Sequence, residues 1–413
     1  MFSKYPPSCH RLIAISAIVQ FFILMSASLA TAGEWTGFRG PAVGGETANA
    51  DPPVRWDESD PPGWAVDLPG QGFSQPVVAG DRIFTTCSGG FSKDRLHVLC
   101  HDFQSGRKLW HRQYWASGRT SVPKTMRVAT PTPVVADGRV YCLFSSGDLA
   151  CLDFQGDLLW YRGLGYDYPH ATNSLGMASS PLIVDGVLIC QLEADSKAFA
   201  IGLDTETGEN LWKIDRFSKA NWTSPIPYVQ ETATSVLLEG GDGVEAIHPQ
   251  TGQTLWEFEC GASTVSSMTL ADDILLVPAN GLTALRLGDI KDDPEQIWNN
   301  KKLSCSFVSP VVVDRKVYTI NSAGVLRCAD VATGELRWQA RVHGEVWGTP
   351  SAAAERLYCP TREGTLVVID LVGEPGEILA EQTIGEGLFS PPVLVKNSIL
   401  LRTDSKLIRI TQP

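Results

Sequence analysis

Short apolar runs separated by turn residues recur along most of the chain. Pro133 to Ala136 and Arg139 to Phe144 are rich in Val, Leu and Tyr, and Asp137-Gly138 separates them. Further Gly and Asp residues precede the runs Leu149 to Leu152 and Leu158 to Trp160. Runs of this length between Gly and Asp residues predict β-strands joined by tight turns. No stretch of a dozen residues has the periodicity of an amphipathic helix.

This four-strand unit repeats along the chain. The units begin at Pro76, Pro133, Pro181, Pro225, about Ser267, Pro310, Pro350 and Pro391. Four short strands in about 40–57 residues form the blade of a β-propeller. The last unit has only three strands, and Gly63 to Leu68 matches the missing outer strand. We therefore predict an all-β fold, an eight-bladed β-propeller of four-stranded antiparallel blades, closed by an N-terminal strand.

The composition and the first residues indicate how the chain is divided into segments. The chain has 413 residues, of which 43% are hydrophobic and 19% charged, as in a globular protein. Lys4 and Arg11, the apolar run Leu12 to Met25 and the small residues Ala30-Thr31-Ala32 predict a signal peptide at 1–32. A retained membrane anchor is the alternative. Residues 33–62 then form an N-terminal extension, and 63–413 form the propeller.

The charge narrows the possible partners. The formal net charge is −12 and no basic run exists, which argues against nucleic acid and an anionic membrane surface. No second apolar run is long enough to span a bilayer. We expect a monomer, exported to the periplasm or the cell exterior, with an envelope protein or a peptide or glycan ligand as its partner.

Export would permit disulfides. Cys142 and Cys151 flank a turn at Ser146-Gly147, which would place them opposite each other across a hairpin. Cys100, Cys151 and Cys328 occupy the same position of the repeat, where small core residues are expected. A disulfide between Cys142 and Cys151 therefore stays an open question.

One phrase of the repeat contains most of its polar signature. An Asp, a Thr-Gly or Ser-Gly turn and a Trp recur at fixed offsets, as in Cys328 to Trp338. The Asp and Thr side chains can accept backbone N–H bonds within the turn, and the Trp can pack on the neighbouring blade. We assign this structural role to Asp102, Trp110, Trp160, Asp204, Trp212, Trp256, Asp330 and Trp338.

The phrase resembles the tryptophan-docking repeat A-x-D-x-x-T-G-x-x-x-W of pyrroloquinoline-quinone (PQQ)-type propellers. Trp35 to Pro41 resembles the W-x-x-F-R-G-P opening of exported bacterial PQQ-like propellers. The resemblance implies one of two classes. The first is the noncatalytic exported propellers, including the BamB-like assembly lipoproteins, from which this chain differs in lacking a lipobox. The second is the quinoprotein dehydrogenases, from which it differs in lacking an adjacent cysteine pair and a recognisable set of calcium ligands.

The loops before each unit surround one mouth of the central channel in this type of repeat. The residues expected there are Phe73, Arg127, His170, Asn173, Trp222, Thr264, Phe307, Trp347 and Phe389. A funnel of aromatic and polar residues can bind a glycan, a peptide or a small molecule. Alternatively, these aromatic side chains only fill the channel. We assign no catalytic, cofactor-binding or metal-binding residue, since no fingerprint of a hydrolase, zinc, P-loop or Rossmann site occurs.

The predicted function is that of an exported, noncatalytic propeller acting as a protein-binding or ligand-binding scaffold in the cell envelope, with no cofactor. The alternative is a PQQ-dependent quinoprotein oxidoreductase that uses PQQ and calcium. The alternative predicts a cluster of carboxylates and a stacking tryptophan deep in the funnel.

Overall fold

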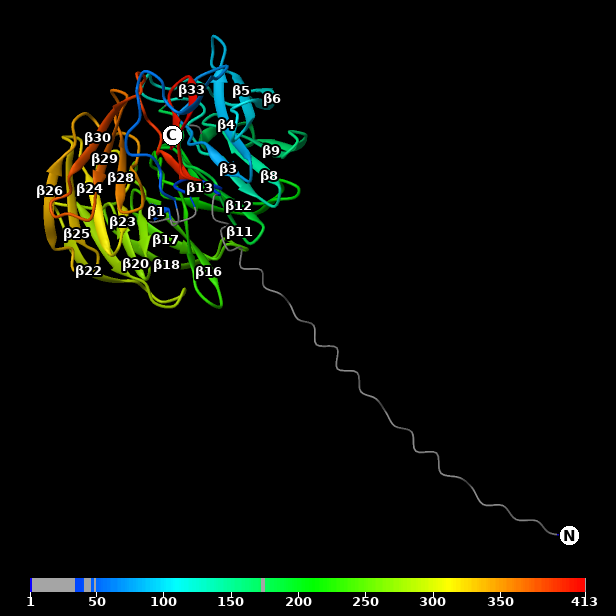
Figure 1. Cartoon of the computed structure of the whole chain (residues 1–413). Helices are drawn as coiled ribbons and strands as arrows, with labels where there is room; N and C mark the ends of the chain where they lie inside the picture. The colour runs from blue at the N-terminus through cyan, green and yellow to red at the C-terminus, as the bar shows by residue number, and fades with distance from the viewer. Residues whose placement is uncertain (2–33, 41–45, 48–49, 172–174, 413) are drawn as a thin grey trace. The chain divides into compact units, whose positions relative to one another are not determined.

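The repeat folds into eight sheets, each built on four antiparallel strands (Figure 1). The computed structural model describes residues 1, 34–40, 46–47, 50–171 and 175–412. The predicted signal peptide, apart from Met1, lies outside the described residues and stays a prediction. Residues 32–413 make up one compact unit, and the eight-bladed propeller predicted from the sequence is confirmed.

We number the sheets as blades 1 to 8 in the chain order of their inner strands. The strands of blades 1 to 4 are β3 (Val77–Ala79), β4 (Arg82–Gly89), β5 (Arg95–Asp102) and β6 (Lys108–Trp115); β7 (Val134–Ala136), β8 (Arg139–Leu143), β9 (Asp148–Asp153) and β10 (Leu158–Gly163); β11 (Leu182–Val184), β12 (Val187–Glu193), β13 (Ala198–Asp204) and β14 (Asn210–Arg216); and β15 (Ile226–Val229), β16 (Thr234–Gly240), β17 (Gly243–Ile247) and β18 (Thr254–Glu259).

Blades 5 to 8 follow the same plan. Their strands are β19 (Thr269–Ala271), β20 (Ile274–Val277), β21 (Leu282–Arg286) and β22 (Glu295–Asn300); β23 (Val311–Val313), β24 (Lys316–Ile320), β25 (Val325–Asp330) and β26 (Leu336–Arg341); β27 (Ser351–Ala353), β28 (Arg356–Pro360), β29 (Thr365–Asp370) and β30 (Ile378–Thr383); and β31 (Val393–Val395), β32 (Ser398–Arg402), β33 (Lys406–Thr411) and β2 (Gly63–Asp67). Strand β1 (Glu46–Thr47) pairs in parallel with β27. A short helix α1 (Leu164–Asp167) and a 3₁₀ turn η1 (Pro169–Ala171) lie between blades 2 and 3.

The tight turns follow from the local sequence. Asp137 and Gly138 both have positive φ, 48° and 73°, and Ala136 pairs with Arg139 on either side. Two successive positive φ angles match the right-handed twist of the strands, and Asp-Gly adopts them readily. The inner hairpin of blade 2 is therefore set by its two-residue turn.

Blade 8 is completed from both ends of the described chain. Strand β2 pairs antiparallel with β33, with Gly63 opposite Ile410 and Asp67 opposite Lys406. The Trp64 indole then donates from Nε1 to the Phe103 carbonyl oxygen of blade 1 at 3.2 Å. The predicted closure by an N-terminal strand is confirmed, and it removes the exposed sheet edge that an open ring would have.

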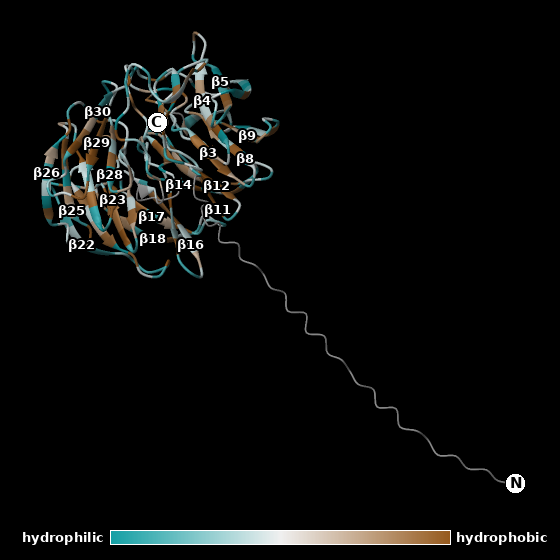
Figure 2. Ribbon diagram, viewed as in Figure 1, coloured by the Kyte–Doolittle hydropathy of each residue, from teal (hydrophilic) through white to brown (hydrophobic). Residues whose placement is uncertain are grey.

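The hydrophobic core lies between neighbouring blades. The strands contain most of the hydrophobic segments in Figure 2, and the hydrophilic ones lie mainly in the loops. Cys142 packs among buried residues of blades 1 and 2, whereas Cys151 packs among those of blades 2 and 3. Cys142 pairs with Ala150 across the hairpin, and Cys151 pairs with Tyr141. The two cysteines thus lie on opposite faces of blade 2 and are both free thiols, so the placement opposite each other is wrong.

The outer-strand tryptophans join neighbouring blades. The indoles of Trp110, Trp160 and Trp212 each lie against the turn glycine of the next blade, and the Nε1 of each donates to a backbone carbonyl there. The distances are 2.8 Å for Trp110 to Phe154, 3.0 Å for Trp160 to Thr205 and 2.8 Å for Trp212 to Pro249. A Cβ added to Gly208 would lie 2.7 Å from the Trp160 ring, so a glycine is needed at this close approach.

The aspartates of the phrase cap their own turns. Asp102 Oδ1 accepts from the backbone N–H of Ser105 at 2.8 Å and from its hydroxyl at 2.6 Å. Asp204 and Asp330 accept equivalent bonds from Thr207 and Thr333. These hydrogen bonds hold the pKa of each aspartate below its usual value, with the Arg337 guanidinium the largest cause at Asp330.

The structure contains one tryptophan joint that was not predicted, and two of the predicted joints lack the hydrogen bond from the indole. Trp298, which the sequence analysis omitted, donates to the Val331 carbonyl at 2.9 Å and lies against Gly334. Trp256 is buried but its Nε1 makes no hydrogen bond to another described residue. The Nε1 of Trp338 is buried without a partner in the described part of the chain.

No helix in the described ranges has both the length and the apolar composition needed to cross a bilayer.

Candidate functional site

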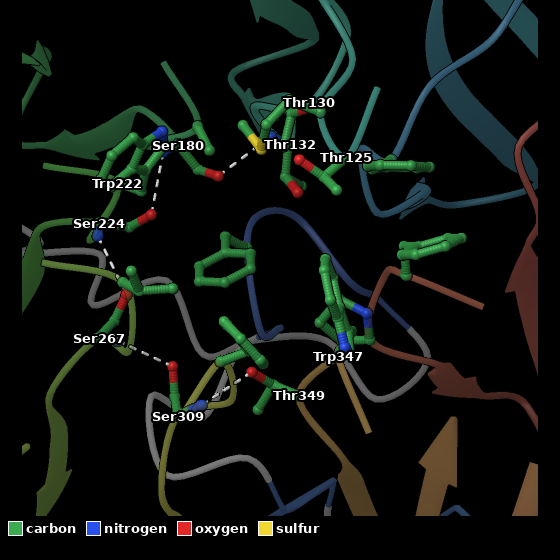
Figure 3. Close-up of a pocket in the computed structure, with 18 of the residues that line it drawn as sticks. Thr125, Thr130, Thr132, Ser180, Trp222, Ser224, Ser267, Ser309, Trp347 and Thr349 are labelled. Carbon is green, nitrogen blue, oxygen red and sulfur yellow. Dashed lines mark hydrogen bonds between the residues drawn. The ribbon is translucent and has the colours of Figure 1, made fainter. Parts of the chain in front are cut away.

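A cavity of about 370 Å³ lies at one mouth of the central channel, where the loops before the inner strands converge (Figure 3). Its aromatic lining residues come from six separate segments of the chain. They are Phe38, Phe73, Trp222, Phe307, Trp347 and Phe389. Most of the remaining lining residues are aliphatic, proline or threonine, with Met126, Ala178 and Val265 among them. The cavity is therefore large enough for a small ligand or one or two side chains of a partner.

Four of the aromatic rings form a continuous arc. Phe73 stacks on Phe389 with ring centroids 4.4 Å apart and an interplanar angle of 21°. Phe389 meets Trp347 edge to face at 6.0 Å, and Trp347 packs on Phe307 at 4.7 Å. This arc crosses the closure between blades 8 and 1 and continues to blade 6. It provides one apolar wall of the cavity.

Hydrogen bonds fix the two tryptophans at the rim. Trp222 donates from Nε1 to the Gly176 carbonyl at 2.7 Å, and its backbone N–H donates to Thr264 at 2.8 Å. Trp347 donates from Nε1 to Glu345 Oε2 at 3.2 Å, and the Arg362 guanidinium lies 4.9 Å from its ring centroid. Both indoles therefore face the cavity with their polar atoms already partnered.

A ring of hydroxyl groups lies beneath the aromatic rim. Each hydroxyl precedes an inner strand, and its oxygen accepts from the backbone N–H of the matching residue of the preceding blade at 2.9–3.1 Å. Figure 3 shows the bonds that link Thr132, Ser180, Ser224, Ser267, Ser309 and Thr349 around the cavity. The ring thus ties successive blades together and faces the cavity.

At blade 1 a glutamine takes the place of the hydroxyl. Gln75 donates its backbone N–H to Thr132, and its side-chain amide donates to the Pro391 carbonyl of blade 8 at 3.3 Å. Its Oε1 accepts from the backbone N–H of Arg39 at 2.9 Å. Gln75 therefore links the ring closure to the N-terminal extension.

Residues 34–40 of the extension pack against the inner strands, and Phe38 among them lines the cavity. Trp35 exchanges two backbone hydrogen bonds with Val78 of blade 1 at 2.8 and 2.7 Å. The Thr36 carbonyl accepts from Val135 of blade 2 at 2.7 Å. A second cavity of about 230 Å³ is lined by residues 36–40 and the inner strands of blades 2 to 4, and Phe38 lines both cavities.

Arg39 anchors residues 34–40 on the other side of the channel. Its guanidinium donates to the Met268 carbonyl at 3.1 Å, to Thr269 Oγ1 at 2.9 Å and to the Pro310 carbonyl at 2.6 Å. Burial lowers the Arg39 pKa to about 10, with Cys305 and Glu239 nearby opposing the shift. Arg39 and Gly40 both have positive φ, 64° and 76°, and a Cβ on Gly40 would lie 2.7 Å from the Trp35 ring. Residues 35–40 thus form a plug that requires Gly40.

Three buried carboxylates among the described residues, those of Glu239, Glu193 and Asp148, lie outside the cavity lining. Glu239 accepts from the Met268 backbone N–H at 2.7 Å, while its Oε1 has no partner among the described residues. Burial raises the pKa of Glu239 well above its usual range. Glu193 accepts from Arg216 Nε at 2.9 Å, from Gln191 at 3.2 Å and from Asn221 at 2.8 Å. Arg216 also pairs with Glu245.

The described lining of the larger cavity does not fit PQQ and calcium. No Asp, Glu, His, Lys or Arg belongs to the described lining of the larger cavity. Calcium takes carboxylate and carbonyl oxygens, and the carboxylate–amide pair near the mouth, Glu193 with Asn221, is already neutralised by the Arg216 guanidinium. Within the described chain, no three His, Cys, Asp or Glu residues gather where they could share a metal ion.

The structure brings together five of the residues expected at the mouth. Phe73, Trp222, Phe307, Trp347 and Phe389 line the cavity.

The other expected mouth residues lie apart from the lining. Arg127 lies behind the arc, with its guanidinium 4.7 Å from the Phe73 ring centroid and 2.8 Å from Asp404 Oδ2. Thr264 contributes its carbonyl to Trp222. His170 lies in η1 and is exposed. Asn173 lies outside the described residues.

Sequence reasoning missed Phe38 and the hydroxyl ring. The signal for Phe38 is the W-x-x-F-R-G-P motif, which was recognised without a position in the fold. The signal for the hydroxyls is the Ser or Thr that opens the repeat, which was interpreted only as the start of a strand.

Comparison with known proteins gives one family and two kinds of relative. The family model that matches is described as outer membrane protein assembly factor BamB, over residues 53–205, 194–346 and 291–382. BamB of Salmonella typhimurium is 29% identical over 168 residues, which are 40% of this chain and 38% of that protein. A polyvinylalcohol dehydrogenase of a Pseudomonas species is 24% identical over 367 residues, 76% of this chain and 52% of that protein. The chain thus spans about half or less of the length of these relatives.

Solved structures support the fold. BamB from Moraxella catarrhalis has a TM-score of 0.64 at 16% identity, covering 84% of this chain and 96% of that one. The quinohemoprotein alcohol dehydrogenase from Comamonas testosteroni has a TM-score of 0.70 at 13% identity, covering 92% and 81%. At these identities the likeness concerns the fold alone.

Proposed function

The chain belongs to the family of the outer membrane protein assembly factor BamB, and we propose on this basis that it is a noncatalytic binding scaffold of the cell envelope. Its ligand is a segment of an envelope protein, which enters the cavity at the channel mouth. The observation that carries the proposal is the described cavity lining of aromatic rings and hydroxyl groups without any titratable side chain. Such a lining can bind a segment, but it offers no general acid, general base or metal ligand.

Export agrees with this role. The first residues have the basic, apolar and small-residue regions of a signal peptide. A scaffold for envelope proteins must reach the compartment in which they assemble. We therefore place the protein in the periplasm or at the cell exterior, with the signal peptide removed.

The alternative, a PQQ-dependent oxidoreductase, is supported by the similarity to polyvinylalcohol dehydrogenases. The polyvinylalcohol dehydrogenase matches 76% of this chain, whereas the Salmonella BamB matches 40%. The chemistry of the described cavity favours the scaffold, because the lining lacks the carboxylates that a calcium-bound quinone requires.

A paired experiment tests the proposal. The wild-type protein and an Ala178→Phe variant, which fills the cavity from its half-buried wall, are immobilised and incubated with envelope extract. We expect the wild type to retain at least one outer membrane protein that the variant loses, with equal thermal midpoints for the two proteins. Equal recovery by both, or recovery by neither, would overturn the proposal.

The second arm measures catalysis directly. The purified protein is loaded with PQQ and calcium and supplied with polyvinylalcohol or a primary alcohol and an electron-accepting dye. The scaffold proposal predicts no dye reduction above that of a heat-denatured sample. Alcohol-dependent turnover that Ala178→Phe abolishes would establish the oxidoreductase instead.

A further inference from the structure

The hydroxyl ring has a donor capacity that the fold does not use. Each of its six oxygens accepts one backbone hydrogen bond, and none of the six hydroxyls donates a hydrogen bond to another described residue. The side chains are 2–6% exposed, so they are more than nine-tenths buried. A hydroxyl has one proton to donate as well as its acceptor lone pairs. The floor of the cavity therefore presents buried O–H groups that lack an acceptor.

The cavity also lacks formal charge. Among its described lining residues there is no acidic, basic or imidazole side chain. Moving a charged group from water into such surroundings without a counter-charge is strongly unfavourable. A ligand that matches this lining is therefore uncharged, and it carries oxygen atoms that can accept hydrogen bonds.

The wall above the ring is apolar and reaches the surface. Phe307 is 42% exposed and Val265 is 39% exposed, while Trp347 and Phe389 continue the wall inward. An aromatic or aliphatic group that enters along this wall would bury its surface against the rings. Removing this apolar surface from water favours binding.

We propose that the cavity binds an uncharged aromatic or aliphatic side chain of a partner polypeptide, together with carbonyl oxygens of the adjoining backbone. The side chain packs on the arc of Phe307, Trp347 and Phe389, and the carbonyls accept from the hydroxyl ring. This inference rests on the proposed scaffold function and names what the scaffold recognises: an apolar, uncharged stretch of an envelope protein.

A sugar would match the lining less well. Sugar hydroxyls both donate and accept, and they need acceptors such as carboxylate or amide oxygens in the site. The described lining has no Asp, Glu, Asn or Gln side chain to accept from them. The donors of the ring instead complement carbonyl oxygens, which only accept.

Small probes test this chemistry. N-acetyl-phenylalaninamide has an aromatic ring, two carbonyls and no charge, and N-acetyl-phenylalanine differs from it by a carboxylate. Binding is followed by the change in the tryptophan fluorescence of the protein, to which Trp222 and Trp347 of the lining contribute, since neither probe contains an indole. We expect the amide to bind at least about tenfold more tightly than the acid. Equal binding of the two, no binding of the amide, or tighter binding of methyl glucoside would overturn the inference.

A matched pair of variants separates recognition from structure. Ser180 lines the cavity, whereas the neighbouring Ser179 is equally buried, at 3% exposure, and does not line it. We expect Ser180→Ala to weaken the amide probe several-fold and to leave ethylbenzene, which has no acceptor, unchanged; Ser179→Ala should change neither. Weakening of both probes by Ser180→Ala, or of neither, would contradict the donor role.

The two proposals fail in different ways. If the amide probe does not bind but Ala178→Phe still releases an outer membrane protein, the scaffold function stands and the ligand chemistry proposed here is wrong. If the amide probe binds and no envelope protein depends on the cavity, the scaffold function falls and the cavity serves a small neutral ligand.

Discussion

The contribution of the indole N–H to a blade joint can be measured with two tryptophans in the same ring. Trp212 and Trp338 are 8% and 7% exposed, and each lies against a turn glycine of the next blade. Trp212 donates from Nε1 to the Pro249 carbonyl at 2.8 Å, whereas the Nε1 of Trp338 is buried without a partner in the described chain. Trp→Phe removes the same atoms at both positions, so the loss of buried apolar surface is similar.

The expected difference follows from the hydrogen bond alone. Trp212→Phe loses a net contribution of about 1 kcal/mol and leaves a carbonyl unpaired, while Trp338→Phe removes an unsatisfied buried donor. We therefore expect Trp212→Phe to lower the free energy of unfolding by about 2 kcal/mol more than Trp338→Phe, more than a tenfold difference in the unfolding constant.

Urea unfolding followed by far-UV circular dichroism measures this difference. The comparison requires equal m-values for the two variants, because only then does a shift of the midpoint report stability. Equal midpoints, or a lower midpoint for Trp338→Phe, would refute the reasoning that the joint depends on the N–H as well as on the ring.

Three further changes test the turns, the buried glutamate and the plug. Gly208 and Gly138 have similar φ angles of 72° and 73°, but an added Cβ would meet a ring, that of Trp160, only at Gly208. Gly208→Ala should therefore have a thermal midpoint well below that of Gly138→Ala. Burial raises the pKa of Glu239, so the folded state retains a proton that the unfolded state releases, and stability is lost as pH rises above the ordinary glutamate pKa. Urea midpoints between pH 5 and 8 should fall for the wild type and stay flatter for Glu239→Gln; parallel profiles would argue against this role. Arg39→Met removes three donated hydrogen bonds and should lower the free energy of unfolding by about 2 kcal/mol. In limited proteolysis we expect the variant to be cleaved within residues 34–62. Protection equal to that of the wild type would show that Arg39 does not anchor the plug.

The ring architecture could be predicted from sequence because its signals are local. A two-residue turn such as Asp137-Gly138 sets a hairpin, and the spacing of such turns sets the blade. The tryptophan joints were harder, because the Trp and the turn that receives it belong to different blades. The turn before Trp298 in blade 5 does not match the repeat, so the joint made by Trp298 was not predicted. The turn that receives Trp298, at Gly334, lies in blade 6.

The candidate site was predicted only in part for the same reason. The rim aromatics precede the repeat starts, so their position follows from the repeat. Phe38 reaches the cavity from a segment with no counterpart in the repeat, and only the packing of Arg39 across the channel reveals its place. The hydroxyl ring depends on the register between blades, since each oxygen accepts from the blade before it. That register is a tertiary property.

The pairing of β2 with β33 has a consequence for the order of folding. Blade 8 needs strands from both ends of the described chain, so it cannot form on a growing polypeptide until residues 406–411 are free. Contacts between such distant segments form slowly, because a long loop must close first. Until then the open ring exposes unpaired strand edges, which favour aggregation. Residues 34–40 must also be in place before the ring shuts around them. We therefore expect the synthesis and docking of residues 406–411 to set the pace at which the native protein accumulates.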